Sequence, residues 1–381
     1  MPQQKNIKVV ADRDIPYLKG VLDNMLEISY LPSGKIDQKA IQDADALLVR
    51  TRSRCDRNLL EKTNVKFIAS ATSGRDHLDE NYCSTAGIVV KNAPGCNSSS
   101  VEQYLASALM RIRSIEKMPF SGMTLGIIGG GHVGEKVRQL GNVFGMKVLL
   151  NDPPRERMEG SKGFADVDFL LRNSDIVSIH VPLNIAGQDK TVGFISRDFL
   201  RKMKSNAWLI NTSRGEVAVN EDLLKNPSDQ KYILDVWENE PHLNKNLFSK
   251  VKIATPHIAG YSVNGKANAT KTIVRELSNF FDLGLDGFEP EIPLPSSNTI
   301  ALKSGNEFEK LEEAITFTYD IMHDDQLLRT QPQLFESLRN NYRKRWEFKN
   351  YEVIMESKNN WVASAIDKLG FNLHIRDNND R

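Results

Sequence analysis

Short apolar runs recur through the first 94 residues, and polar or helix-like stretches separate them. The runs read IKVVAD, ALLVRT, VKFIAS and GIVVKN. Unbroken apolar runs of this length are typical of strands that are buried on both faces of a parallel sheet. The pattern therefore predicts a small α/β domain over residues 1–94.

A second series of apolar runs occupies residues 95–260. It follows an apolar helix, SVEQYLASALMRI, and reads MTLGIIG, KVLLND, DIVSIHVP, AWLINTS, KYILDVW and VKIATPH. The alternation of these runs with helix-like segments predicts a second α/β domain with a parallel sheet.

The chain changes character after GLDGFEPEIPLPSSN, whose glycines and prolines predict a linker. Beyond it, EFEKLEEAITFTYDIM and LFESLRNNYRKRW predict helices, NYEVIME predicts a strand, and a final helix precedes GFNLHI. We expect a small α+β domain over residues 291–381.

Composition excludes several classes of protein. A chain of 381 residues is too long for one compact core, and its net charge of +1 disfavours nucleic acid as a partner. No apolar segment reaches the 18 residues of a membrane span, and MPQQKNIKVV does not resemble a secretory leader. Because Cys55, Cys83 and Cys96 have neither disulfide-framework nor metal-ligand spacing, we expect a cytoplasmic protein without a metal.

Candidate chemistry begins in GIIGGGHVGEKV, where Gly129, Gly131 and Gly134 follow the order G-x-G-x-x-G. An apolar run precedes this loop, and apolar residues at helical spacing follow it, which is the context of a dinucleotide site. The first glycine permits a tight turn, the second lets the backbone approach a pyrophosphate, and the third allows close packing of helix on strand. The start of the helix adds N–H groups and a positive dipole end.

An acidic residue, Asp152, ends the next apolar run, KVLLND, eighteen residues beyond Gly134. A carboxylate there can accept hydrogen bonds from ribose hydroxyls and repel the 2′-phosphate of NADP, which favours NAD as the cofactor. The alternative is a strand-end residue that caps the turn before Pro153. Arg155 is close in sequence and would weaken the preference for NAD.

Titratable residues follow three later apolar runs. Arg214 follows AWLINTS, Asp235 and Glu240 lie in ILDVWENEP, and His257 follows VKIATP. The carboxyl ends of parallel strands share one edge of a sheet, so we expect these side chains to face the same opening as the glycine loop.

Three of these side chains suit the oxidation of a 2-hydroxy acid. Arg214 can bind the carboxylate and polarise the C2 oxygen. A neutral His257 can accept the hydroxyl proton, and Glu240 can orient the imidazole and stabilise its charged form. Each residue alone would more often be structural, and their combination carries the prediction.

The stretches GxGxxG…D, NTSRG, DVWENEP and TPHIAGY together resemble the D-isomer-specific 2-hydroxyacid dehydrogenase family. Further stretches, among them TSGRDHLD, NAPGCNSSSVEQY, NDPPR and NYRKRWEF, extend the resemblance through nearly the whole chain to a branch that acts on a small phosphorylated hydroxy acid. The resemblance implies an α/β fold with two Rossmann-like parallel-sheet domains flanking a cleft. It also implies that residues 261–290 complete the first domain and that the C-terminal domain forms a homodimer.

The resemblance implies individual contacts as well. Substrate contacts fall on Thr51, where the family more often has serine, and on Thr72 and Tyr261. Contacts with NAD fall on Gly129, Gly131, His132, Val133, Gly134, Asp152, Thr212, Ser213, Arg214, Asp235 and Gly260.

Two basic clusters are candidates for binding the substrate phosphate. Arg50, Arg52 and Arg54 would share one face if VRTRSR stays extended. Arg343 and Arg345 end the predicted helix LFESLRNNYRKRW, where dimerisation would bring them near the partner's cleft. A solvated surface is the alternative for both clusters.

Two other functions stay open at this point. The chain could oxidise another 2-hydroxy acid such as 3-phosphoglycerate, or it could bind NAD as a sensor without turnover. The tail resembles that of the branch named above, which disfavours another substrate. The presence of all three catalytic residue types disfavours a sensor without turnover. For His77 and His180, each beside apolar residues, we expect structural roles.

Overall fold

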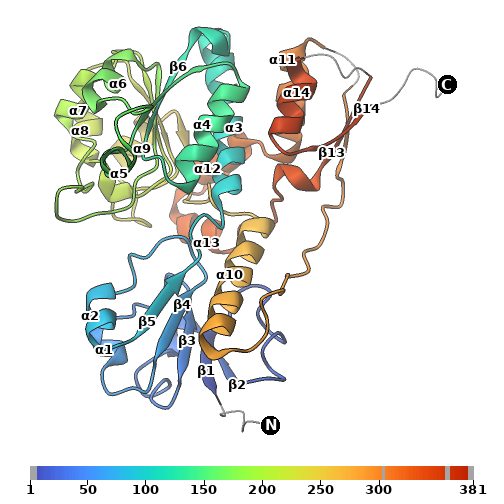
Figure 1. Ribbon diagram of the computed structural model, residues 1–381. Coiled ribbons are helices and arrows are strands. Elements are labelled where there is room, and N and C mark those ends of the chain that lie inside the picture. Colours follow the sequence, from blue (N-terminus) through green and yellow to red (C-terminus); the bar gives the residue numbers. More distant parts are fainter. Residues whose placement is uncertain (1–6, 303–304, 357–360, 376–381) are drawn as a thin grey trace. The chain divides into compact units, whose positions relative to one another are not determined.

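The computed structural model describes residues 7–302, 305–356 and 361–375 (Figure 1). The chain packs into two compact units. The first unit consists of Met1–Asn97 and Val263–Pro293, and the second of Ser98–Ser262 and Leu294–Arg381. The tail therefore groups with the second unit, and its division into a separate third domain stays a prediction.

A five-stranded parallel sheet, in the order β2-β1-β3-β4-β5, forms the centre of the first unit. Its strands are β1 (Lys8–Asp12), β2 (Glu27–Leu31), β3 (Ala46–Val49), β4 (Phe67–Ser70) and β5 (Val89–Asn92). The helices of this unit are η1 (Ser33–Lys35), α1 (Arg57–Leu60), α2 (Glu80–Thr85) and α10 (Val263–Phe281).

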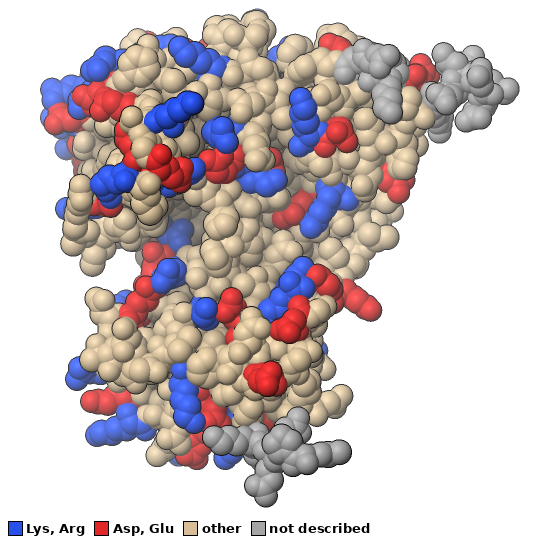
Figure 2. All heavy atoms as spheres, in the orientation of Figure 1, with Lys and Arg blue, Asp and Glu red and all other residues tan. Residues whose placement is uncertain are grey.

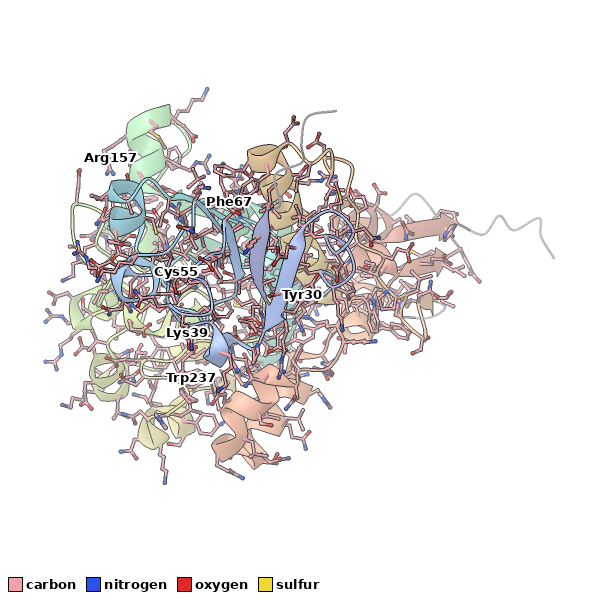
Figure 3. All side chains as sticks on the ribbon, turned by 90° about the horizontal axis from the view of Figure 1, so that it is seen from below. Tyr30, Lys39, Cys55, Phe67, Arg157 and Trp237 are labelled. Carbon is pink, nitrogen blue, oxygen red and sulfur yellow. The ribbon has the colours of Figure 1, made fainter. Side chains whose placement is uncertain are left out.

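The central strands β1, β3 and β4 are buried on both faces, which explains their unbroken apolar runs. On one face, Ile273 and Leu277 of α10 pack against strand residues such as Val9. The ring of Phe67, labelled in Figure 3, lies 4.9 Å from that of Phe280. On the other face lies Cys55, where burial raises the pKa of the thiol to about 12. All three cysteines are free thiols.

A six-stranded parallel sheet, in the order β11-β10-β9-β8-β6-β7, forms the centre of the second unit. Its strands are β6 (Thr124–Ile128), β7 (Lys147–Asn151), β8 (Ile176–Ile179), β9 (Trp208–Asn211), β10 (Lys231–Leu234) and β11 (Ile253–Ala254). The chain runs from β6 to β7 on one side and then returns to β8 on the other. Ligands of such sheets bind beyond the carboxyl ends of the strands at this reversal.

Helices cover both faces of the second sheet (Figure 1). On one face, α3 (Ser98–Glu116) packs beside α4 (His132–Val143). The core on the opposite face receives side chains from α6 (Val167–Asn173), α7 (Arg197–Lys202), α8 (Asn220–Lys225) and α9 (Lys245–Lys250). The remaining helices before the tail are η2 (Phe120–Gly122), α5 (Pro153–Glu159) and η3 (Gly215–Val217).

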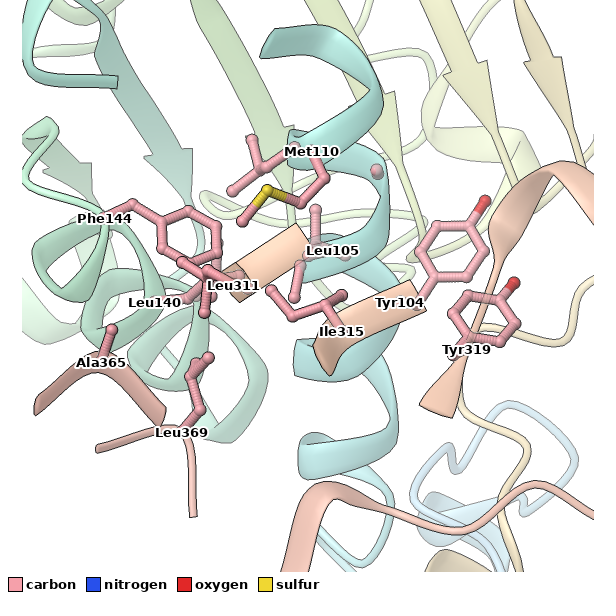
Figure 4. Packing of buried hydrophobic residues seen from close by; sticks show 14 of the residues in the cluster. Tyr104, Leu105, Met110, Leu140, Phe144, Leu311, Ile315, Tyr319, Ala365 and Leu369 are labelled. Carbon is pink, nitrogen blue, oxygen red and sulfur yellow. The ribbon is translucent and has the colours of Figure 1, made fainter. Parts of the chain in front are cut away.

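The tail adds a small parallel sheet, β12-β13-β14, and shares its core with α3 and α4. Figure 4 shows Leu311 and Ile315 of the tail packed among Leu105 and Leu140. The strands are β12 (Thr299–Ala301), β13 (Glu352–Met355) and β14 (Asn372–Ile375). The helices are α11 (Glu307–Thr318), α12 (Ile321–Thr330), η4 (Pro332–Leu334), α13 (Phe335–Asn340), η5 (Phe348–Asn350) and α14 (Trp361–Lys368).

The predicted α/β architecture with parallel sheets is confirmed, but two helices of the tail were predicted too long. The helix expected through Met322 breaks at Asp320, which caps α12 by accepting a hydrogen bond from the Met322 N–H at 2.9 Å. The helix expected over LFESLRNNYRKRW ends at Asn340. Arg345 and Glu347 are buried and bonded to distant segments instead, and these tertiary contacts outweigh the local helix propensity.

Two expectations for the first unit also need correction. Strand β2 was missed because it lies at the sheet edge and none of its residues is fully buried, so its sequence is not an unbroken apolar run. The chain turns after β3, where the Ser53 N–H donates to the Arg50 carbonyl at 3.2 Å, so the arginines of VRTRSR do not share an extended face. Arg54 instead forms an ion pair with Asp56 at 3.2 Å.

Charges of both signs are interspersed over the face shown in Figure 2, as the near-zero net charge predicts. Many belong to exposed ion pairs, such as Lys202 with Asp168 at 2.7 Å. Across the residues that the structure describes, we find no helix with the length and apolar character needed to cross a membrane.

Candidate active site

The glycine loop between β6 and α4 has the geometry that the sequence predicts. Gly129 has a φ of +93°, and a Cβ there would lie 2.4 Å from the carbonyl oxygen of His180. A Cβ on Gly134 would lie 1.9 Å from the carbonyl oxygen of Gly129, so the helix packs on the loop without room for a side chain. Both positions therefore require glycine for the fold itself.

Gly131 differs from its neighbours, because a Cβ there would meet no other atom within 4 Å. It precedes His132 and Val133 at the start of α4 and provides no side-chain cap. An uncapped helix start beside open space fits the pyrophosphate of a dinucleotide. The residues present thus fit the NAD that the sequence predicts.

Asp152 directly follows β7 and stabilises the glycine loop through hydrogen bonds. Its Oδ2 accepts a hydrogen bond from the Gly130 N–H at 2.7 Å, and its Oδ1 caps α5 by accepting one from the Arg155 N–H at 3.0 Å. The capping role that the sequence left as an alternative is therefore present. An ionised carboxylate can accept about four hydrogen bonds, so this contact leaves capacity for ribose hydroxyls.

The guanidinium of Arg155 forms hydrogen bonds and ion pairs with neighbouring groups of this region. Its guanidinium donates to Glu159 Oε1 at 2.8 Å, to Glu135 Oε1 at 2.7 Å and to the Gly130 carbonyl at 2.5 Å. The hydrogen bonds that Arg155 donates, first to Glu159 and then to Glu135, raise the pKa of its guanidinium. Its charge is balanced within the fold, which removes the reason to expect a weakened preference for NAD.

His257 and Glu240 form a hydrogen-bonded pair beyond β11 and β10. The imidazole Nδ1 lies 2.5 Å from Glu240 Oε1. Burial alone would raise the pKa of Glu240, but the hydrogen bond from His257, with the charges of His257 and Arg339, holds it below its ordinary value. Because an ionised carboxylate only accepts, Nδ1 carries the hydrogen and Nε2 can accept a proton.

Asp235 fixes the backbone that carries this histidine. Its Oδ1 accepts hydrogen bonds from the Thr255 hydroxyl at 2.6 Å and the Ile258 N–H at 2.8 Å, and its Oδ2 accepts from the Ala259 N–H at 2.9 Å. His257 has a φ of +56°, a conformation that bulky residues adopt only when their surroundings impose it. Asp235 thus supports the loop that carries His257, and its contact with the cofactor stays a prediction.

Arg214 lies in the loop that follows β9, the strand next to β10. Asn211 shapes this loop, because its Oδ1 accepts from the Ser213 N–H at 3.0 Å and its amide donates to the Arg214 carbonyl at 2.9 Å. A Cβ on Gly215 would lie 2.0 Å from the backbone carbon of Trp237, three residues before Glu240. The loop of Arg214 therefore packs directly on the segment that leads to the glutamate.

His180 lies after β8 and contacts the next strand-end loop. Its Nε2 lies 2.8 Å from the Ser178 hydroxyl, and its Nδ1 lies 3.5 Å from the Thr212 hydroxyl. Burial lowers the pKa of His180 to about 3, so its ring is neutral at physiological pH. The expected structural role fits this environment.

The expected substrate residues of the first unit follow adjacent strands, Thr51 after β3 and Thr72 after β4. Thr72 is hydrogen-bonded to Ser70 at 2.8 Å, and Ser70 also contacts Nε2 of the buried His77 at 2.8 Å. His77 therefore helps to orient Thr72. Nearby, Arg75 forms an ion pair with Glu80.

Tyr261 follows the turn that contains Gly260 and lies against the tail. Its hydroxyl accepts a hydrogen bond from Arg339 Nε at 3.1 Å, and Arg339 Nη1 lies 3.2 Å from Glu240 Oε1. Arg345 is only 1% exposed and donates to the Ala259 carbonyl at 2.6 Å. Both alternatives considered for Arg345, a solvated face and a reach toward a partner's cleft, are therefore wrong.

Sequence reasoning missed Asn211, Gly215 and Arg339 in this site. Asn211 and Gly215 flank the recognised arginine within NTSRG, so a search for loop-shaping residues around it could have found them. Arg339 is 99 residues from Glu240 and 78 from Tyr261, and nothing in its local sequence marks it.

Comparisons with known proteins agree with this geometry. Residues 98–259 match the family model described as D-isomer specific 2-hydroxyacid dehydrogenase, NAD binding domain. Residues 292–370 match a model described as a domain of unknown function, DUF3410. A solved structure of NAD-bound 3-phosphoglycerate dehydrogenase from Entamoeba histolytica aligns with a TM-score of 0.62 and 25% identity, covering 75% of this chain and 99% of that one.

Two similar relatives match over nearly their full length. The erythronate-4-phosphate dehydrogenase of Bacteroides thetaiotaomicron is 43% identical over 91% of this chain and 99% of its own. That of Escherichia coli O1:K1 / APEC is 36% identical over 96% of this chain and 98% of its own.

Fold, glycine loop and family model together define an NAD-dependent dehydrogenase of the D-isomer specific 2-hydroxyacid class. The predictions of this class and of NAD as cofactor are confirmed. Within the class, the chain belongs to the erythronate-4-phosphate dehydrogenase family.

Proposed function

We propose that this protein oxidises the C2 hydroxyl of 4-phospho-D-erythronate to give 3-hydroxy-2-oxo-4-phosphobutanoate, a step of vitamin B6 (pyridoxal phosphate) biosynthesis. The activity for which these relatives are named supports the substrate. The observation that carries the chemistry is the contact of 2.5 Å between His257 and Glu240 at the sheet edge that also bears Arg214.

Each residue has a separate task in this reaction. Arg214 binds the substrate carboxylate and polarises the C2 oxygen. His257 accepts the hydroxyl proton at Nε2, and Glu240 stabilises the imidazolium that forms. Bound NAD would supply the acceptor for the hydride from C2, which carries two electrons and one proton, while the hydroxyl proton goes to His257.

Binding of NAD is assigned to the glycine loop and the strand-end loops. The start of α4, from Gly131 through Val133, would hold the pyrophosphate, and Asp152 would accept hydrogen bonds from the adenosine ribose. Thr212, Ser213 and Arg214 would lie along the nicotinamide half, with Asp235 and Gly260 in the neighbouring loops.

Substrate contacts are proposed for Thr51, Thr72 and Tyr261. We also propose that the protein forms a homodimer through its C-terminal domain and acts in the cytoplasm. The exposed Arg343 remains a candidate contact at such an interface, although it pairs with Asp324 at 3.7 Å in its own chain.

The test is a spectroscopic assay of NADH formation with NAD and each candidate acid. We expect turnover with 4-phospho-D-erythronate and at least tenfold lower kcat/KM with 3-phosphoglycerate, because a site fitted to one hydroxy acid loses transition-state contacts with the other. Sedimentation velocity tests the dimer separately.

A further inference from the structure

Arg339, on helix α13 of the tail, reaches the catalytic pair. Its Nη1 lies 3.2 Å from Glu240 Oε1, the same oxygen that contacts His257 Nδ1 at 2.5 Å. Its Nε donates to the Tyr261 hydroxyl at 3.1 Å, and the side chain is 25% exposed. One carboxylate oxygen is therefore shared between the imidazole and a guanidinium.

Helix α13 is held in place by the core beneath the site. Phe335, at its start, is 1% exposed and belongs to the same hydrophobic cluster as Trp237 and Ala254. Beyond the helix, the ring of Tyr342 packs edge-on against Tyr261 at 6.1 Å. The position of the guanidinium is thus fixed at both ends of its short helix.

The tail also holds the backbone on both sides of His257. Before the histidine, Asp325 accepts a hydrogen bond from the Ala254 N–H at 2.7 Å. After it, Arg345 donates to the Ala259 carbonyl at 2.6 Å, and Glu347 accepts from the Ser262 hydroxyl at 2.9 Å. All of these tail residues are buried or partly buried, so the catalytic loop is built against the tail.

We propose that the tail, the domain of unknown function, completes the catalytic site of its own chain, with Arg339 as a positioning residue that sets the charge acting on His257. The proposal rests on the dehydrogenase function proposed above. The guanidinium offsets part of the Glu240 charge, which would otherwise stabilise the imidazolium more strongly.

Other titratable and charged groups lie on the segments that carry the pair or pack against these segments, and they remain in every variant below. Asp235, Glu238 and His242 come from β10 and its following loop, Arg214 follows β9, and Tyr261 follows β11. The tail contributes Asp324 and Arg343, which lie against Tyr342. A change at Arg339 alone therefore reports its own contribution.

The test compares Arg339→Gln and Arg339→Met with Arg339→Lys. The pH dependence of kcat/KM is measured for NAD-linked oxidation of 4-phospho-D-erythronate. In both neutral variants, the midpoint of the acid limb should rise by about one pH unit, a roughly tenfold loss at a pH on that limb. Raising the pH should recover the loss, and Arg339→Lys should return the midpoint toward that of the wild type.

Lys349→Met is the matched control, because it removes one exposed positive charge from the same tail. It should leave the profile unchanged. Binding of NADH, followed by fluorescence, identifies any variant that has failed to fold. A neutral variant that binds NADH but keeps the wild-type midpoint would overturn the proposal, as would an equal loss at every pH. A raised KM with an unshifted limb would make Arg339 a substrate anchor instead, and would also overturn it.

A second readout does not depend on turnover. The carboxyl ¹³C signal of Glu240, assigned with Glu240→Gln, should titrate with a higher pKa in Arg339→Gln than in the wild type. An unchanged titration contradicts the role of Arg339, whereas a wild-type protein without turnover contradicts only the proposed reaction.

Discussion

The Oε1 atom of Glu240 lies 2.5 Å from Nδ1 of His257, and the two residues follow neighbouring strands of one sheet. This contact fixes which imidazole nitrogen is available to the substrate. In the proposed reaction Glu240 would stabilise the imidazolium, and its contact with His257 also supports the loop that carries this histidine.

Replacement of the glutamate by its amide tests the first role. Glu240→Gln should lower kcat/KM by about 100-fold, because a neutral amide does not stabilise the imidazolium that forms in the reaction. The acid limb of the pH profile should move to lower pH, opposite to the shift expected for neutral variants of Arg339. Glu238→Gln, in the same loop, should stay within about twofold of the wild type.

Glu240→Gln should also change how the free energy of unfolding depends on pH. The folded protein holds the pKa of Glu240 below its ordinary value, so the contact stabilises the fold above the unfolded pKa of about 4.3 and ceases to do so as the pH falls through the folded value. Urea unfolding at a series of pH values should show the stabilities of wild type and Glu240→Gln approaching each other as the pH falls below the unfolded pKa. A stability difference between the two proteins that grows as the pH falls would contradict this role of the Glu240 carboxylate.

Two residues of the glycine loop between β6 and α4, Gly131 and Gly134, allow effects on folding to be separated from effects on cofactor binding. Gly134→Ala should destabilise the fold by about 2–3 kcal/mol, because the added Cβ collides with a backbone carbonyl. Gly131→Ala should leave the melting temperature unchanged and weaken NADH binding about tenfold, since the methyl group enters open space. Thermal melts and fluorescence titrations measure the two effects, and equal NADH affinity of Gly131→Ala and wild type would remove the pyrophosphate assignment.

Asp235→Asn tests the support of the catalytic loop. An amide cannot accept all three hydrogen bonds that the carboxylate accepts, so we expect a loss of about 2–3 kcal/mol and of most activity. The exposed Asp229→Asn is the control, with a change below about 0.5 kcal/mol. Full activity of Asp235→Asn would show that His257 does not need this anchor.

Asp152→Ser addresses the choice of cofactor. Serine still caps α5 but cannot also accept from the Gly130 N–H, so the stability loss should be about 1–3 kcal/mol, while the charge that disfavours a 2′-phosphate is removed. The ratio of kcat/KM with NADP to that with NAD should rise about tenfold or more. A ratio that stays at the wild-type value would assign Asp152 to the glycine loop and the helix cap alone.

The sequence predicted the parts of the fold that local patterns determine. Strands buried on both faces appear as unbroken apolar runs, and Gly129 and Gly134 stand where the backbone leaves no space for a Cβ. Strand β2 was not predictable in this way, because EISYL lies at the sheet edge with no fully buried residue and is not an unbroken apolar run. The tail helix that ends at Asn340 was overestimated, because buried contacts of Arg345 decide its boundary.

In the candidate site too, some residues could be predicted from the sequence and others could not. His257, Glu240 and Arg214 could be proposed because each follows an apolar run, and parallel topology brings such ends together. Asp152 accepts hydrogen bonds from Gly130 and Arg155, and Asp235 accepts them from the loop that carries His257. These contacts depend on loop geometry that sequence spacing does not specify. Arg339 depends on long-range packing of α13, so only the structure brings it to the site.

The central claim is tested most directly by single-turnover oxidation of 4-phospho-D-erythronate, with NADH absorbance followed in wild type and in His257→Asn at equal NAD saturation. We expect a substrate-dependent rise in NADH in the wild type, and a rate at least 100-fold lower in the variant, because no base remains to take the hydroxyl proton. Comparable rates in the two proteins, or no NADH from the wild type, would contradict the account.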